Sequence, residues 1–169
     1  MASDAITTRL QKRAGRIIRN IPPEDLPEWP GYTIGSSIVL PGNKVDGKMT
    51  INGARGFSSK IADRFDLTLE CIRRYYDDRK QWSPLEDVLL RYREFFALFC
   101  DFNGYVDFFL LQDLLKTDGT IDFFHDFDDF NTPAVPQDEA QYLEYLAKSN
   151  DFIRARNARI TGQPCTHPS

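Results

Sequence analysis

The sequence has few of the residues that nucleophilic and metal chemistry most often use. Only His125 and His167 are histidines, and three residues are cysteines, in a chain of 169. Ser–His and Cys–His catalysis both depend on a positioned histidine, so this scarcity argues against them. The cysteines, Cys71, Cys100 and Cys165, are odd in number and lack zinc-site spacing. We interpret them as reduced and structural, as expected of a soluble, cytoplasmic protein.

Long apolar runs and a secretion signal are also missing. Residues 1–15 are polar and basic, unlike the apolar centre of a signal peptide. The most apolar run, residues 105–115, is interrupted by Asp107, Gln112 and Asp113. It is too short to cross a bilayer. We therefore expect no membrane span.

Charge is unevenly distributed along the chain, whose net charge is −4. Residues 1–80 contain 14 Lys and Arg against 10 Asp and Glu, whereas residues 81–169 contain 7 against 15. Proteins that coat nucleic acids need a clearly basic domain, so this composition argues against general nucleic-acid binding. The asymmetry permits a local basic site, a protein partner, or a homo-oligomer formed head to tail.

What the sequence does contain is a globular composition, with 41% hydrophobic and 13% aromatic residues. Its apolar periodicity predicts an α+β, mainly α fold, in which about four to five helices form the core beside one small β-hairpin or sheet. We expect a basic amphipathic helix at residues 1–21, a single globular domain at 22–160 and a disordered tail at 161–169.

The first half of the domain is expected to contain the sheet and one charged helix. Residues 32–40 and 48–51 alternate in polarity around an Asp-Gly turn signal, which predicts a β-hairpin. A helix is expected from Ser58 or Ser59 to about residue 78, with one apolar face and one charged face. Leu67 interrupts the charged face, so we expect another segment to cover it.

The second half is expected to be helical. A capping box that begins at Ser83 predicts a helix with an apolar stripe reaching Phe99. Residues 105–116 fit either a buried central helix or a buried strand, because periodicity alone does not separate the two. Residues 121–131 are expected to be irregular, and about 137–160 to form the last helix.

The densest polar chemistry lies in residues 50–74. A strand is expected to lead into a glycine-punctuated loop, Asn52–Gly56, that opens the charged helix. Backbone N–H groups and an arginine at a helix N-terminus commonly bind anions. The loop is neither a Gly-Lys-Ser/Thr phosphate loop nor a complete dinucleotide fingerprint. The candidates for binding a phosphorylated or nucleotide-like ligand are Asn52, Arg55, Arg64 and Arg73.

The charged face of the same helix allows two interpretations. Asp63, Asp66 and Glu70 are catalytic candidates, because a row of carboxylates can hold a divalent cation or supply a general base. Glu70 equally fits an ion-pair ladder with Arg73 and Arg74, since helical side chains meet at i+3 and i+4. The sequence leaves these alternatives open, and with them whether the protein is an enzyme.

A second candidate lies in an acidic and aromatic stretch. His125 is surrounded by carboxylates that include Asp126 and Asp128, and these residue types ligate manganese, iron or zinc. Alternating Asp and Phe is equally typical of an acidic loop that its aromatic side chains hold in place. The sequence therefore gives a metal hypothesis beside a structural one.

Three stretches of sequence are distinctive: DGKMTINGARG at residues 46–56, IADRFDLTLECIRRYY at 61–76 and GYVDFFLLQDL at 104–114. Together they resemble a family of uncharacterised bacterial proteins, a domain of unknown function, over about residues 32–160. That family has no assigned activity, cofactor or substrate, so the resemblance implies none here. It does imply that this chain is short at its N-terminus.

Two function hypotheses follow. In the first, the protein binds or acts on a phosphorylated small molecule through residues 50–74. In the second, it is a non-enzymatic protein-interaction or self-association module, and its charged face is a structural set of ion pairs. The basic N-terminal helix and acidic second half favour the second hypothesis, whereas the loop and its arginines favour the first, which is the main prediction and leaves the second as its alternative.

Overall fold

The structure is a computed structural model that describes residues 2–5, 13–77 and 81–162, the first of these by backbone alone. Strand β1 (Ala2–Ala5) pairs antiparallel with strand β2 (Ser37–Leu40). The helical elements, α-helices first and 3-10 helices second, are α2 (Gly15–Ile18), α3 (Ile51–Phe57), α4 (Phe65–Tyr76), α5 (Glu86–Arg91), α6 (Arg93–Ala97), α7 (Phe102–Phe109), α8 (Glu139–Thr161), η1 (Pro23–Asp25), η2 (Ile34–Ser36) and η3 (Gln112–Leu114).

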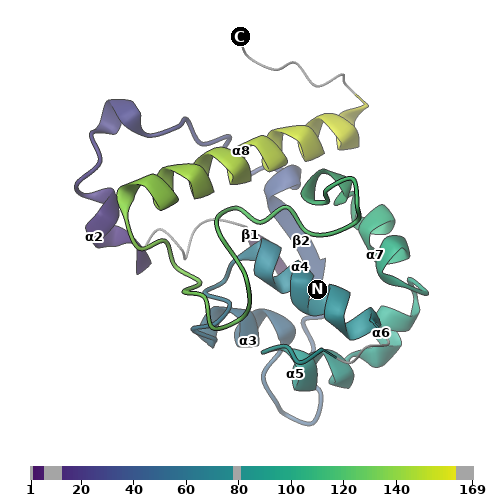
Figure 1. The fold of residues 1–169 in the computed structure, drawn as a ribbon. Helices are drawn as coiled ribbons and strands as arrows, with labels where there is room; N and C mark the ends of the chain where they lie inside the picture. Colours follow the sequence, from purple (N-terminus) through teal and green to yellow (C-terminus); the bar gives the residue numbers. More distant parts are fainter. Residues whose placement is uncertain (1, 6–12, 78–80, 163–169) are drawn as a thin grey trace.

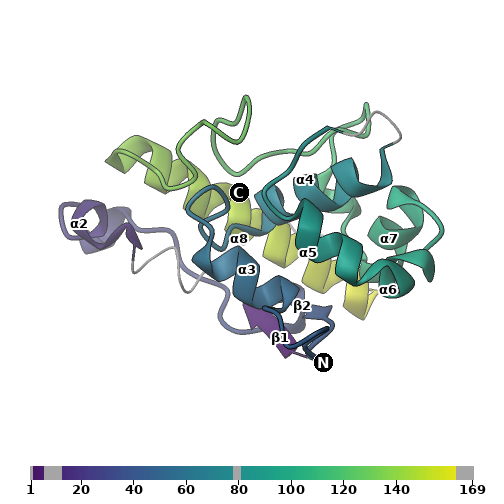
Figure 2. The ribbon, with the colours of Figure 1, turned by 90° about the horizontal axis from the view of Figure 1, so that it is seen from below.

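These elements form a mainly helical α+β fold, which confirms the predicted class (Figure 1). The long helix α8 lies along one side of the shorter helices. Seen from below, α3, α5 and α6 lie in front of α8 (Figure 2). Within the described part of the chain, no helix combines the length and apolar character needed to cross a membrane.

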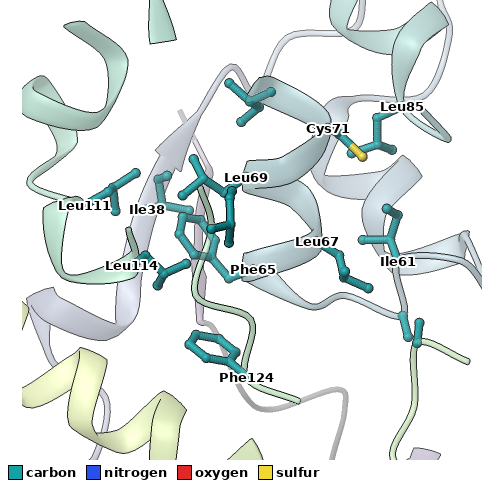
Figure 3. Packing of buried hydrophobic residues seen from close by; sticks show 14 of the residues in the cluster. Ile38, Ile61, Phe65, Leu67, Leu69, Cys71, Leu85, Leu111, Leu114 and Phe124 are labelled. Atoms are coloured by element: carbon teal, nitrogen blue, oxygen red, sulfur yellow. The ribbon is translucent and has the colours of Figure 1, made fainter. Parts of the chain in front are cut away.

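Helix α4 is the centre of the core. Every residue from Ile61 to Ile72 is buried, so the helix is enclosed on its charged face as well as its apolar face. Phe65 and Leu69 point toward β2 and the residues after α7, whereas Leu67 lies on another side of the helix (Figure 3). A helix enclosed all round belongs in a protein interior. The expectation that another segment covers Leu67 is therefore confirmed.

The predicted hairpin is wrong, although the prediction of one small sheet holds. Strand β2 pairs with β1, in a register that sets Ala2 opposite Leu40, and residues 48–50 are not a strand. The chain instead enters α3, because the Thr50 hydroxyl accepts a hydrogen bond of 3.2 Å from the Gly53 N–H. That bond is an N-cap, which satisfies one of the free donors of the first helical turn.

The boundaries of two helices also differ from their predictions. Helix α4 begins at Phe65 because Ala62 and Asp63 have left-handed φ angles of 52° and 67°, which a right-handed helix does not accommodate. The predicted capping box is absent, since α5 has no side-chain cap and Ser83 hydrogen-bonds to Cys71 instead. The predicted apolar stripe of α5 and α6 is buried except at Phe95, which is half-buried.

Residues 105–116 are neither one central helix nor a strand. Helix α7 ends at Phe109 and η3 follows it, and Phe108 is 69% exposed. The irregular segment at 121–131 and the last helix, α8, are both confirmed. Of the basic N-terminal helix predicted at residues 1–21, only α2 is helical among the described residues, and residues 2–5 are strand β1 instead because they pair with β2. Residues 6–12 of that prediction, and 163–169 of the predicted tail, lie outside the described residues.

Candidate functional site

The predicted site consists of two helices, α3 and α4, joined by a tight turn. The Asp63 N–H donates to the Arg55 carbonyl at 3.2 Å, and the Arg64 N–H donates to the Ile61 carbonyl at 2.9 Å. Two successive left-handed residues, Ala62 and Asp63, reverse the chain between them. Each such residue costs roughly 1–2 kcal/mol. The turn therefore persists because the packing and the hydrogen bonds around it outweigh that cost.

Arg55 lies at the centre of a first buried cluster. Its Nε donates to the Thr68 hydroxyl at 2.7 Å, its Nη1 to Asn52 Oδ1 at 3.3 Å and its Nη2 to the Asp63 carbonyl at 3.1 Å. The Asp63 carboxylate lies 3.8 Å from Nη1. The structure thus brings together three predicted site residues, Asn52, Arg55 and Asp63. It adds Thr68, whose hydroxyl also donates to the Arg64 carbonyl at 2.7 Å.

Arg64 forms a second buried cluster that reaches a distant segment. Its guanidinium makes a two-pronged contact with Asp66, in which Nε donates to Oδ1 at 3.0 Å and Nη2 to Oδ2. Its Nη1 lies 2.5 Å from His125 Nε2 and 3.2 Å from the Ala134 carbonyl. Arg64 and Asp66 are both 0% exposed. Such a pair is stable in a protein interior only with hydrogen bonds of this quality.

The contact between Arg64 and His125 fixes the state of the imidazole. A guanidinium has donors and no acceptor, so this hydrogen bond requires His125 Nε2 to accept in a neutral ring with its proton on Nδ1; the Ala134 carbonyl lies farther from Nε2, at 3.4 Å. Burial lowers the pKa of His125 from its ordinary value, and the neighbouring charge of Arg64 lowers the pKa further. His125 is therefore a fixed acceptor for Arg64.

These contacts tie residues 117–138, which we call the strap, across α4. The strap connects the end of η3 to the start of α8 (Figure 1). Asp66 Oδ2 accepts the Phe124 N–H at 2.9 Å. Lys60 donates to the Phe130 carbonyl at 2.9 Å, and the Arg74 guanidinium lies 4.7 Å from the centre of the Phe130 ring. The strap is the segment that covers the charged face of α4.

The third group of predicted residues forms an ion-pair ladder on the last turns of α4. Glu70 accepts two hydrogen bonds from Arg73, at 2.8 and 2.9 Å, and one from Arg74 at 2.7 Å. The hydrogen bonds to Glu70 raise the pKa of Arg73 above its ordinary value. Glu70 is only 4% exposed. It therefore has three guanidinium donors at hydrogen-bonding distance and little contact with solvent.

The metal candidates do not lie together around one point. His125 faces inward toward Arg64, whereas Asp126 and Asp128 are exposed on the strap. Among the residues that the structure describes, no three His, Cys, Asp or Glu side chains are grouped closely enough to hold a metal ion. The Nε2 atom of His125 is also already engaged with Arg64.

The groups of polar side chains around Arg55, Arg64 and Glu70 all form their bonds within the chain. A general base must reach its substrate, and an anion site needs donors that are free to turn toward the anion. The carboxylates of Asp66 and Glu70 and the guanidiniums of Arg55 and Arg64 are buried and bonded within the chain. The arrangement therefore holds α3, α4 and the strap together.

A further polar cluster, which the sequence does not predict, is formed by Arg156 and Asn157 of α8. Arg156 of α8 is buried and donates to three carbonyls, those of Ser37 at 2.7 Å and of Gly35 and Phe109 at 3.1 Å. Asn157 accepts the Gly35 N–H at 2.8 Å. Burial lowers the pKa of Arg156 from its ordinary value. In the sequence, the only signal for this cluster is the polar pair Arg156-Asn157 near the basic end of the last helix. In the fold, the pair anchors α8 to η2 and β2.

Comparison with known proteins places the chain in a family. Residues 1–160 match a family described as "Family of unknown function (DUF6994)". No curated protein and no solved structure matches the chain. The match bears out the resemblance carried by residues 46–56, 61–76 and 104–114, while the expected N-terminal shortening stays a prediction. Because the match extends over most of its length, the chain belongs to this family of unknown function.

Proposed function

We propose that this protein is a non-enzymatic association module that binds a second copy of itself through the acidic strap. The observation that carries the proposal is the charge of residues 117–147, which contain eight carboxylates and no Lys or Arg. All eight are exposed; they are Asp118, Asp122, Asp126, Asp128, Asp129, Asp138, Glu139 and Glu144. Such a surface attracts a basic one and repels a like one.

Among the described residues, few of these carboxylates have a cation at ion-pair distance. Asp122 and Glu144 lie 3.9 and 3.0 Å from Lys148 Nζ. The remaining six form no ion pair with any other described residue. Like charges along one segment repel each other over roughly the Debye length of about 10 Å. A basic surface on a partner would relieve that repulsion, so association is expected to weaken as salt is added.

The contacts of residues 50–74 support this proposal over a phosphorylated-ligand function. To bind a phosphate, Arg55 would have to leave Thr68, Asn52 and Asp63, and Arg64 would have to leave Asp66 and His125. Each exchange would expose or strand a buried charge, which typically costs several kcal/mol. The ion pairs are therefore better explained as contacts that hold the strap against α4.

Sedimentation velocity of the full chain tests the proposal. We expect the sedimentation coefficient to rise with protein concentration at about 20 mM salt and the rise to disappear at about 500 mM salt. Replacing three strap carboxylates, Asp126→Asn, Asp128→Asn and Asp129→Asn, is expected to abolish the rise. A matched control neutralises three exposed carboxylates elsewhere, Glu24→Gln, Asp25→Asn and Glu28→Gln, and should behave like the wild type.

Two outcomes would overturn the proposal. One is a wild-type chain that stays monomeric at every concentration in low salt. The other is a saturable rise in melting temperature with millimolar inorganic phosphate or ATP that Arg55→Lys abolishes, since a ligand that binds only the folded state stabilises it. The second outcome would restore the phosphorylated-ligand hypothesis.

A further inference from the structure

A groove runs between residues 41–46 and helices α5 and α6. It consists of two adjoining hollows of about 380 and 460 Å³ that share Val45, Arg91 and Glu94 in their walls. The Tyr92 hydroxyl donates to the Asn43 carbonyl at 2.7 Å and so fixes one wall to the helices. The groove is therefore a built feature of the fold.

Arg91 is the guanidinium that both hollows of this groove share. Its Nη1 donates to the Asp87 carbonyl at 3.1 Å and its Nη2 to the Met49 carbonyl at 3.0 Å. Its Nε is buried and has no hydrogen-bond partner. Arg91 forms no ion pair with any residue that the structure describes. A guanidinium held in place by two carbonyls, with no ion pair among the described residues, can donate to a carboxylate that reaches its exposed side.

The surroundings of Arg91 are basic at the rim and apolar on the walls. Arg93 also lines the groove, and Lys44 and Lys48 are exposed on the loop beside it. None of these three forms an ion pair within the described chain. Arg91 and Arg93 balance the two lining carboxylates, Asp46 and Glu94, and Lys44 and Lys48 add two further cations beside the groove. Apolar contact comes from Pro41, Val45, Leu90 and Phe95.

The strap has the complementary pattern. Its exposed carboxylates Asp126 and Asp128 flank Phe127, which is only half-buried. Phe127 packs on Phe123 and Phe130, with ring centres 4.4 and 5.1 Å apart, and lies against the core, so it presents the part of its ring that stays exposed. A partner surface with cations at its rim and an apolar floor matches that pattern in both charge and polarity.

We infer that the groove between residues 41–46 and α5–α6 is the surface that receives the strap of a second copy, with strap carboxylates at Arg91 and Arg93 and Phe127 against the apolar wall. This inference rests on the proposed self-association. The strap and the groove share no residue, so the contact is heterologous. Contacts of that kind produce head-to-tail chains or rings, because each copy keeps one free strap and one free groove.

Complementary variants of the full chain test this geometry. The groove variant is Lys44→Gln, Lys48→Gln and Arg93→Gln, all at exposed positions where the fold should tolerate glutamine. The strap variant is the triple Asp→Asn change described above. Each variant alone is expected to lose the concentration-dependent rise in sedimentation coefficient. An equal mixture should form one-to-one dimers and nothing larger, because it contains one intact strap and one intact groove per pair.

The control and the opposing outcomes separate this inference from the proposed function. Neutralising three exposed cations elsewhere, Arg16→Gln, Arg19→Gln and Lys116→Gln, should leave association unchanged. If the wild type associates and the groove variant associates equally well, the groove assignment is overturned and the proposed function stands. If the wild type is monomeric, both fail. If the monomer binds polyglutamate through the groove, the occupant is another acidic chain and the second copy is ruled out.

Discussion

Replacing Asp66 with asparagine removes the carboxylate that neutralises the buried guanidinium of Arg64. The substitution keeps the volume of the side chain, so its effect reports charge and hydrogen bonding rather than packing. Arg64 loses its two-pronged contact and stays enclosed at 0% exposure. Breaking a buried pair by removing one partner typically costs about 3–5 kcal/mol. Because His125 and the Ala134 carbonyl remain as acceptors, we expect the lower end, about 3 kcal/mol.

Urea unfolding followed by circular dichroism measures that loss as a change in the free energy of unfolding. For a chain of this size about 3 kcal/mol corresponds to a fall of about 10 °C in melting temperature. The control is Asp151→Asn, which removes a single contact of 3.4 Å with Arg154 at an aspartate whose side chain is 78% exposed. Exposed pairs contribute little, so the control should lose less than about 1 kcal/mol.

A second measurement locates the effect in the strap. The Phe124 amide donates to Asp66, so Asp66→Asn should speed hydrogen exchange at Phe124 more than at amides in the middle of α8. Equal losses of stability in Asp66→Asn and Asp151→Asn, with no change in strap exchange, would refute the idea that this cluster holds the strap to α4.

Three further predictions concern other parts of the molecule. Because the pKa of His125 is lowered in the fold from an ordinary value of 6.5, the unfolded chain binds more protons; stability should therefore fall as the pH drops below about 6.5 toward the folded pKa, and His125→Gln should flatten that slope in melting temperature. A Cβ at Gly35 would lie 2.6 Å from Asn157 Oδ1, so Gly35→Ala should cost about 1–3 kcal/mol in urea unfolding, whereas Gly15→Ala, which meets nothing within 4 Å, should be neutral. Burial raises the pKa of Cys71 to about 12, so iodoacetamide should label it only after unfolding, and rapid native labelling seen by peptide mass mapping would contradict this.

Local periodicity was enough for the helices whose apolar stripe faces a core. The last helix, at about 137–160, is predicted from apolar residues at 3.6-residue spacing, because that spacing depends only on neighbouring residues; Tyr142 and Leu146 are two of the residues it buries. Helix α3 was missed because Gly53 and Gly56 favour a loop reading. Each glycine costs a helix about 1 kcal/mol, yet the Thr50 cap and the burial of Gly56 outweigh that preference.

In the candidate site too, local contacts could be predicted from the sequence and long-range contacts could not. The contacts of Glu70 with Arg73 and Arg74 could be predicted, because i+3 and i+4 side chains meet on any helix. The contact between Arg64 and His125 could not, because 61 residues separate them and no local pattern records which segment will cover a charged face.

The sequence by itself determined the mainly helical class, the last helix, the irregular acidic stretch and the charge asymmetry, all of which follow from composition and short-range spacing. Only the tertiary structure decided that the charged face of α4 is buried, that β2 pairs with the N-terminal segment, and that the strap displays its carboxylates outward. Long-range pairing and burial depend on where distant segments meet. The same polar residues that suggested a ligand site in the sequence are therefore, in the folded chain, the contacts that hold the strap in place.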